Sequence, residues 1–159
     1  MLNLRTVSPT LFSLSYIGSE LTGARYRPLF ASLAPDVASE SLAVIASTHV
    51  TPDSGTGLVH CAPAHGTEDY NMFREQSLIS SISSIVCHVG EGGLFTNEVA
   101  QVVGKEAGET LVGQPVLDSG SKSIVGLLKS MGCLLKIERF KHRYPYDWKT
   151  DRPVIVTYV

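Results

Sequence analysis

The residue types best suited to chemistry gather in one short stretch, residues 55–70. It contains two histidines, His60 and His65, and an acidic pair that ends in Asp69. An imidazole can move a proton or bind a metal ion. A carboxylate in the first turn of a helix can bind an ammonium group or simply complement the helix dipole. The stretch therefore predicts a pocket that His60 faces, with Asp69 at its edge.

A metal site is the least favoured interpretation of these residues. His60 and Cys61 are neighbours, so on a strand their side chains would point to opposite faces. Their spacing to His65 matches no familiar set of zinc ligands. We therefore expect no metal, and the default interpretations are a core histidine at His60 and a dipole-complementing carboxylate at Asp69.

The elements around these residues must position them. We expect a strand at 56–62 that ends in a turn fixed by Pro63 and Gly66. A helix should follow from 67 to about 76, with acidic groups in its first turn. This arrangement would hold Asp69 beside the end of the strand.

Two glycines open the stretch. Gly55 and Gly57 flank Thr56 and would let a ligand approach the backbone closely. No Lys-Ser/Thr pair follows them, so the segment is not a phosphate loop. Taken alone, Gly55-Thr56-Gly57 predicts no more than a turn.

Short strands and one further helix are predicted for the rest of the chain. Strands are expected in a strand–turn–strand unit at 17–30, at 41–50, in a short strand and loop at 94–103, and at 133–141, with loops or turns at 31–40, 51–55 and 90–93 and an irregular tail at 142–159. The helix is expected at about 122–131, with Asp118 or Ser119 as its N-cap and Gly132 at its C-terminal end. This pattern predicts a β-rich α+β fold, a barrel-like domain with helical insertions.

The composition indicates a single globular domain. The chain has 159 residues, of which 43% are hydrophobic and 18% charged, and its formal net charge is -2. That is enough apolar material for one sizeable core. No run approaches the roughly 20 apolar residues of a membrane-spanning helix. The three cysteines have unrelated spacing, so no disulfide framework is expected and a reducing compartment is favoured.

A basic cluster with interleaved aromatic residues lies near the C-terminus. Its basic residues are Lys136, Arg139, Lys141, Arg143, Lys149 and Arg152, against the acids Glu138, Asp147 and Asp151. The interleaved aromatic residues are Phe140, Tyr144, Tyr146 and Trp148. The cluster is either a solvated surface or a face that stacks on or docks against a partner.

Residues 55–70 follow the pattern Gly-Thr-Gly-x-Val-x-x-x-Pro-x-His-x-x-x-Asp-Tyr. This pattern resembles the hallmark of the editing domain of isoleucyl-tRNA synthetases, which the valine and leucine enzymes share. Segments 18–30 and 142–155 look like a strand of that domain and like the segment that leads back to the catalytic domain. The histidine at 60 and the glycine at 66 favour the isoleucine member, and Tyr-Pro-Tyr-Asp-Trp at 144–148 looks like its bacterial and mitochondrial branch.

The resemblance implies a hydrolytic activity and assigns roles to residues. Asp69 would hold the α-amino group of a misattached amino acid, and His60 would help to shape a pocket that admits valine and rejects isoleucine. The remaining substrate-binding residues that it implies are Gly55, Thr56, Gly57 and His65. The reaction would be hydrolysis of valyl-tRNA specific for isoleucine at its 3′ end, by water and without a cofactor. The ATP and Mg²⁺ of a whole synthetase would belong to a catalytic domain whose motifs this sequence lacks.

The same resemblance predicts a division of the chain into three parts. Residues 1–16 would be a leader or a truncated element, residues 17–141 a partial editing domain without its threonine-rich strand, and residues 142–159 a connector toward the absent catalytic Rossmann domain. Because one wall of the pocket would then be missing, the alternative function is an inactive relic or a tRNA-binding module. An unrelated β domain with a chance motif is a third possibility. The rest of the synthetase is an expected partner, and a membrane is not.

The N-terminus supplies a further indication of a compartment. Residues 1–16 contain Arg5 and several hydroxyl side chains but no acids, which resembles a mitochondrial transit peptide. The mitochondrial matrix is therefore the predicted location, with the cytoplasm as the alternative.

Overall fold

The computed structural model describes residues 17–35, 41–51, 57–138 and 143–157. The α-helices are α1 (Gly18–Leu21), α2 (Thr67–Glu75), α3 (Ala100–Val103), α4 (Lys105–Leu111) and α5 (Ser121–Ser130). The strands are β1 (Arg25–Tyr26), β2 (Leu42–Ala43), β3 (Tyr146–Asp147) and β4 (Arg152–Pro153). Two 3₁₀ turns, Ile82–Ser84 and Asn97–Val99, and a π-helical turn, Val116–Gly120, complete the described part.

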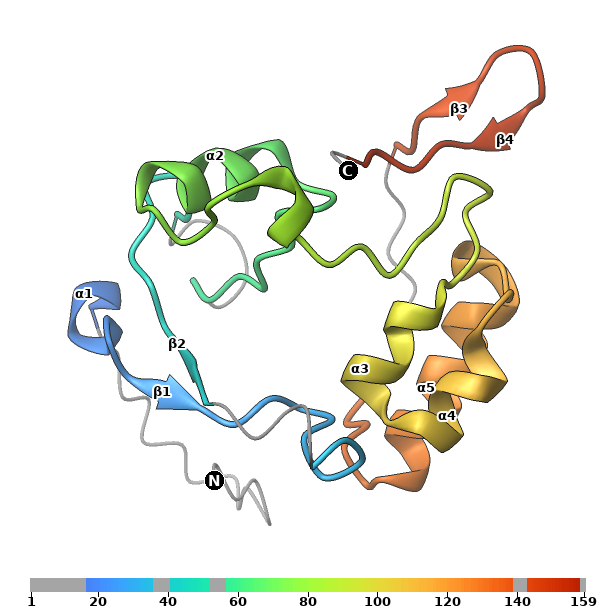
Figure 1. The fold of residues 1–159 in the computed structure, drawn as a ribbon, viewed down its shortest axis with the longest axis horizontal. Helices are drawn as coiled ribbons and strands as arrows, with labels where there is room; N and C mark the ends of the chain where they lie inside the picture. The colour runs from blue at the N-terminus through green and yellow to red at the C-terminus, as the bar shows by residue number, and fades with distance from the viewer. Residues whose placement is uncertain (1–16, 36–40, 52–56, 139–142, 158–159) are drawn as a thin grey trace.

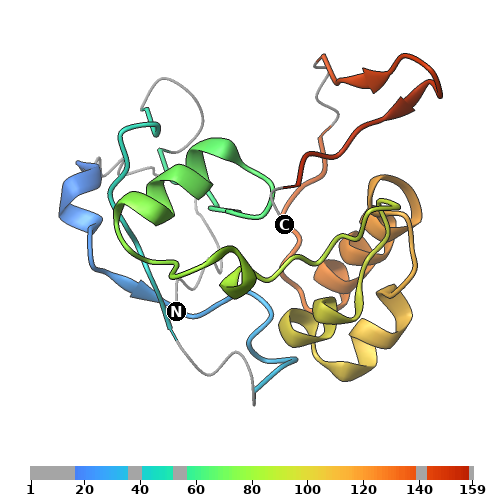
Figure 2. The same ribbon diagram turned by 45° about the horizontal axis from the view of Figure 1, so that its top comes forward.

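These elements form an open α+β arrangement. In Figure 1, β1, β2 and α2 lie on one side, while α3, α4 and α5 gather on the other. The β3–β4 hairpin extends away from the helices, and Figure 2 shows the same separation from a second direction. Within the described residues the strands form two separate two-stranded sheets and no barrel. The prediction of an α+β fold is confirmed. The described part is not β-rich as predicted, because more of its residues are in helices than in strands.

The predicted strands are shorter than their sequence suggested. β1 pairs antiparallel with β2, so the expected strand at 41–50 is limited to two residues. The first half of 17–30 forms helix α1 rather than a strand, because Glu20 accepts a bond from the backbone of Ile17 and closes a helical turn. In their described parts, 56–62 and 133–141 form no strand. Strand-forming side chains need a partner strand to pair with, and no described strand pairs with these segments.

The tail contains regular structure where an irregular segment was expected. β3 and β4 pair antiparallel with Asp147 opposite Arg152. The Asp147 carboxylate accepts hydrogen bonds from the Lys149 and Thr150 backbones and from the Thr150 hydroxyl. The Thr150 hydroxyl contributes most to holding the pKa of Asp147 below its usual value. This local network closes the hairpin turn, which is why β3 and β4 form.

Both predicted helices are present. The expectation at 67–76 corresponds to α2, and the one at 122–131 corresponds to α5. Gly132 follows α5 with a φ of +67°, the left-handed conformation that glycine adopts cheaply. The expected caps at Asp118 and Ser119 are wrong, because these residues lie inside the π-helical turn and Gly120 occupies the N-cap position.

Two further helices were missed: α3 lies where a short strand and loop were expected at 94–103, and α4 lies after that stretch, where no element was predicted. Val99, Val103 and Leu111 from this region form the buried centre of the helical side. The partly buried side chains packed against them are Phe30, Phe95, Ala107, Ile124 and Leu127. Ala107 and Leu111 are four residues apart in α4, so they lie on the same face of that helix.

Gly104 joins α3 to α4 and brings the turn at 28–35 onto the helices. Its φ is +83°, and an added Cβ would lie 2.1 Å from the carbonyl oxygen of Leu33. Phe30 on the same turn packs against the helical core. The close approach at Gly104 thus links the two sides of the molecule.

The core is small for the size of the chain. Of the described residues, only seven hydrophobic side chains are buried: Ala31, Ala34, Ala64, Met72, Val99, Val103 and Leu111. Large apolar side chains remain on the surface, among them Leu135, Ile137 and Trp148. No helix in the described ranges combines the length and the hydrophobicity that crossing a lipid bilayer requires.

Candidate functional site

Asp69 lies in the first turn of α2, where the helix dipole favours a carboxylate. Its side chain is only 14% exposed. Oδ2 accepts a hydrogen bond from the backbone N–H of Ala62 at 2.8 Å, which ties the helix to the end of the extended segment before it. One carboxylate oxygen is therefore fixed by the backbone, and the other is left for a different partner.

Gly66, the N-cap of α2, makes room for this arrangement. A Cβ at position 66 would lie 2.8 Å from Oδ2 of Asp69. Because the obstructing atom is the end of a side chain, a larger residue would displace the carboxylate and leave the helix backbone in place. The glycine is thus needed for the position of the carboxylate and not for the turn itself.

We expect Gly66→Ala to break the bond between Asp69 and Ala62 while leaving the fold intact. The Ala62 amide would lose its acceptor, and its hydrogen exchange should become about ten times faster, the change that corresponds to one neutral hydrogen bond of about 1.4 kcal/mol. Amide exchange followed by NMR measures this directly. Gly18→Ala is the control, since nothing lies within 4 Å of a Cβ at that position. Unchanged exchange at Ala62 would contradict the steric role of Gly66.

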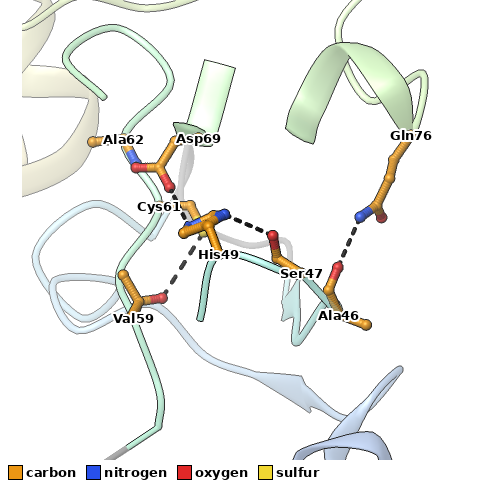
Figure 3. Close-up of polar contacts among 8 residues, drawn as sticks. All are labelled: Ala46, Ser47, His49, Val59, Cys61, Ala62, Asp69 and Gln76. Atoms are coloured by element: carbon orange, nitrogen blue, oxygen red, sulfur yellow. Dashed lines mark hydrogen bonds and ion pairs between the residues drawn. The ribbon is translucent and has the colours of Figure 1, made fainter. Parts of the chain in front are cut away.

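His49 supplies the contact to the second carboxylate oxygen. Its Nε2 lies 3.3 Å from Oδ1 of Asp69, and its Nδ1 lies 2.7 Å from the hydroxyl oxygen of Ser47. Figure 3 shows Ser47, His49 and Asp69 in a row between two segments that are distant in the sequence. Neither Ser47 nor His49 was predicted from the sequence. The available signal was their spacing, since residues two apart would share a face on the strand predicted at 41–50. In the structure His49 lies in a turn.

The segment that carries His49 is held along helix α2 at two points. The side-chain amide of Gln76, just past the end of α2, donates to the carbonyl of Ala46 at 2.8 Å. His49 meets Asp69 at the other end of the helix (Figure 3). The segment therefore runs antiparallel to α2, which fixes the position of the imidazole relative to the carboxylate.

Cys61 is the other side chain that interacts with Asp69. Burial raises the pKa of its thiol, and the charge of Asp69 and a hydrogen bond to it raise the pKa further. A raised pKa keeps the thiol protonated at neutral pH, and a protonated thiol is a poor nucleophile and a poor metal ligand. Among the described residues, no group of three or more His, Cys, Asp or Glu side chains is arranged to hold a metal ion.

His65 links the motif to the C-terminal segment. Its Nδ1 lies 2.9 Å from the carbonyl oxygen of Val156, and its Nε2 lies 3.7 Å from the sulfur of Cys87. His88 lies nearby, and burial, together with the charge of His65, lowers its pKa. The contacts of His65 thus hold two parts of the chain together.

The other predicted site residues do not join Asp69. His60 is exposed, and the contacts to Asp69 come from Ala62, His49 and Cys61 instead. Gly57 is partly buried with a φ of +72°, and nothing lies within 4 Å of a Cβ at that position. Gly55 and Thr56 lie outside the described residues. The substrate-binding roles of these residues stay predictions.

Three aromatic residues of the basic cluster, Tyr144, Tyr146 and Trp148, lie on or beside the β3–β4 hairpin, and Phe140 lies outside the described residues. Trp148 is 85% exposed, and the Lys149 ammonium lies 5.3 Å from the centre of its ring. Tyr144 and Tyr146 pack edge to face with their ring centres 6.3 Å apart. Such a surface presents flat rings and positive charge together.

Comparison with known proteins gives one consistent result. No family model matches the chain. It is 36% identical over 138 residues to a protein named isoleucine–tRNA ligase, cytoplasmic, of Arabidopsis thaliana, covering 87% of this chain and 11% of that protein. It is 39% identical over 122 residues to isoleucine–tRNA ligase, mitochondrial, of Gallus gallus, covering 77% of this chain and 11% of that protein. It is 38% identical over 139 residues to isoleucine–tRNA ligase of Prochlorococcus marinus, covering 87% and 12%. The chain thus spans only about an eighth or less of the length of these relatives.

Proposed function

Because this chain is homologous to a segment of the isoleucine–tRNA ligases, we propose that it serves in the editing of isoleucyl-tRNA formation. In this function it hydrolyses valine that has been wrongly attached to the tRNA for isoleucine. The proposal follows from the motif at 55–70 and from the position of Asp69. The use of ATP and Mg²⁺, which the sequence resemblance implies for a whole synthetase, is not part of the activity proposed for this chain.

The observation that carries this proposal is the placement of the Asp69 carboxylate. Its Oδ2 is fixed by the Ala62 N–H, and its Oδ1 lies 3.3 Å from Nε2 of His49. A mostly buried carboxylate with one oxygen oriented by the backbone is a receptor for a cationic nitrogen, because charge-assisted hydrogen bonds are the stronger ones. The α-ammonium group of an aminoacyl ester is such a nitrogen.

Editing is needed because a single binding site cannot select strongly enough between isoleucine and valine. One methylene in an apolar pocket is worth only about 1–3 kcal/mol, a limit for which the isoleucine enzymes themselves are the known case. A second site that is too small for isoleucine then removes the smaller product. In the proposed division of labour, Asp69 recognises what both amino acids share, and the pocket excludes the larger side chain.

The proposed chemistry is hydrolysis of an ester. Water adds to the ester carbonyl carbon, the bond to the ribose oxygen of the terminal adenosine breaks, and free valine and tRNA are released. Asp69 holds the ammonium group and so orients the carbonyl for attack. The Cys61 thiol stays protonated because its pKa is raised, and it takes no part as a nucleophile.

Incubating the full chain with tRNA for isoleucine that carries either valine or isoleucine tests the proposal. We expect the valyl ester to be hydrolysed at least about ten times faster than the isoleucyl ester, since the difference is one methylene in an apolar pocket. Release of radiolabelled amino acid gives both rates, with buffer alone as the baseline. Equal rates for the two esters, or rates no higher than in buffer, would contradict the proposal.

A tRNA-binding module is the second candidate function, and the β3–β4 hairpin is the observation that favours it. Trp148 is 85% exposed beside Lys149, and exposed rings next to positive charge suit stacking on unpaired bases. The incubations with charged tRNA distinguish the two candidate functions, since binding of tRNA without hydrolysis of the ester would indicate the tRNA-binding module. The proposal fits both predicted locations, the mitochondrial matrix and the cytoplasm, since the relatives include proteins named as cytoplasmic and as mitochondrial.

A further inference from the structure

We propose that His49, held by Ser47, is a positioning residue that orients the Asp69 carboxylate for an ammonium group. The inference rests on the proposed function, because it concerns the same carboxylate. Its basis is the row of contacts from Ser47 Oγ to His49 Nδ1 at 2.7 Å and from His49 Nε2 to Asp69 Oδ1 at 3.3 Å. Nothing in the sequence motif includes either Ser47 or His49.

The hydrogen-bonding capacities of the three side chains determine where the proton facing Asp69 lies. An ionised carboxylate only accepts, so the proton on the side facing Asp69 is on His49 Nε2. In the neutral ring Nδ1 is then an acceptor, and the Ser47 hydroxyl is a donor that can supply its proton. An uncharged ring in this tautomer leaves the negative charge of Asp69 available to a cation.

Burial makes the orientation matter. The side chains of His49 and Asp69 are 24% and 14% exposed, so water can hydrogen-bond to only part of the carboxylate. With Oδ2 held by the Ala62 N–H, the contact to Oδ1 determines how the carboxylate plane is turned. Without His49 the plane could rotate about Oδ2, and an arriving ammonium group would meet a less ordered acceptor.

The backbone around His49 is anchored independently of the ring. The Gln76 side chain holds the carbonyl of Ala46 at 2.8 Å, three residues before the imidazole (Figure 3). Changing the ring should therefore leave the path of the segment unchanged. This allows the role of the imidazole to be tested without losing the fold.

The test measures how strongly the full chain prefers a ligand with an amino group. The two probes are adenosine with valine attached to its ribose through a non-hydrolysable amide, and the same compound with 3-methylbutanoate in place of valine. The second lacks only the α-amino group. Dissociation constants are measured by calorimetry for the wild-type chain, His49→Phe, His49→Gln and Ser47→Ala.

We expect His49→Phe to reduce the preference for the amino-bearing probe about tenfold, the size of one lost hydrogen bond to a charged group. Affinity for the probe without the amino group should stay the same. His49→Gln keeps a donor and should retain part of the preference, and Ser47→Ala should lose less than His49→Phe. Glu68→Gln, an exposed acid in the same turn of α2 that is outside the site, is the control and should change neither constant.

The outcomes separate this inference from the proposed function. A wild-type preference that His49→Phe leaves unchanged would overturn the inference and leave the proposed function standing. No preference in the wild-type chain would overturn the amino-binding role of Asp69, and the inference with it. Equal losses for both probes in His49→Phe would show a general packing role and would also overturn the inference.

NMR of the histidine ring nitrogens gives a check that needs no ligand. The inference requires His49 to carry its proton on Nε2 in the wild-type chain. Asp69→Asn should change the Nε2 signal of His49 and leave the Nδ1 signal of His65 unchanged, since the latter contacts Val156. A neutral His49 ring protonated on Nδ1, or an Nε2 signal that stays the same in Asp69→Asn, would contradict the contact on which the proposal is built.

Discussion

Replacing Asp69 by asparagine should slow hydrolysis of valyl-tRNA for isoleucine by about 10- to 100-fold, the loss expected when a hydrogen bond to a charged group of about 1.5–3 kcal/mol is removed. Asparagine keeps an acceptor for the Ala62 N–H, so the turn before α2 should stay intact. What disappears is the negative charge that would hold the α-ammonium group. The rate of valine release from charged tRNA under single-turnover conditions measures the effect.

Two further variants sharpen this prediction. Asp69→Ala should lose as much activity and also some stability, because it leaves the Ala62 N–H without its partner. Glu68→Gln removes an exposed acid from the neighbouring position and should keep the wild-type rate. If Glu68→Gln were as slow as Asp69→Asn, the effect would be one of overall charge and the specific role of Asp69 would be wrong.

Gly104→Ala should give the largest loss of stability, about 3 kcal/mol or more, since it combines a disfavoured backbone conformation with a steric clash. The φ of +83° is costly for any residue with a side chain, and the new Cβ would lie 2.1 Å from the Leu33 carbonyl oxygen. Both atoms belong to the backbone framework, so neither can rotate away. The turn at 28–35 and the α3–α4 unit would have to separate.

The midpoint of thermal unfolding measures this loss, and two other glycines are matched controls. Gly113 has a similar φ of +78° but open space around it, so Gly113→Ala should cost only the backbone term of about 1–2 kcal/mol. Gly126 lies inside α5 with nothing within 4 Å of an added Cβ, so Gly126→Ala should stabilise by about 0.5–1 kcal/mol. A Gly104→Ala loss no greater than that of Gly113→Ala would show that the contact with Leu33 is not needed.

The sequence predicted those elements whose signals are local. Helices α2 and α5 follow from acidic residues at a helix start and from a glycine at a helix end. Helices α3 and α4 were missed because Gly104 and Gly108 interrupt their apolar pattern. The reason for these glycines is visible only in the folded structure, where an added Cβ at Gly108 would lie 2.5 Å from the Cβ of Ala100. In a local sequence pattern glycine indicates the end of a helix, whereas here it permits α3 and α4 to pack closely.

The site was predictable to the same extent. Asp69 was found because its position at a helix start is visible in the sequence. His49 was not, since its contact depends on how segment 46–49 lies against α2, and no local rule gives that register. The predicted direction of His60 depended on a strand at 56–62. Because the described part of that segment forms no strand, alternation along a strand does not place the side chain.

The contact between His65 and Val156 has a consequence for the order of events during protein synthesis. The two residues are 91 positions apart, yet the imidazole meets its carbonyl partner at 2.9 Å. A ribosome that adds about 5–20 residues per second needs about 5–20 seconds to make the intervening chain. Throughout that interval the motif that carries Asp69 exists without its C-terminal support. His65 therefore gains this contact only after Val156 has been translated, and a pause before Val156 would prolong the interval in which the motif lacks it.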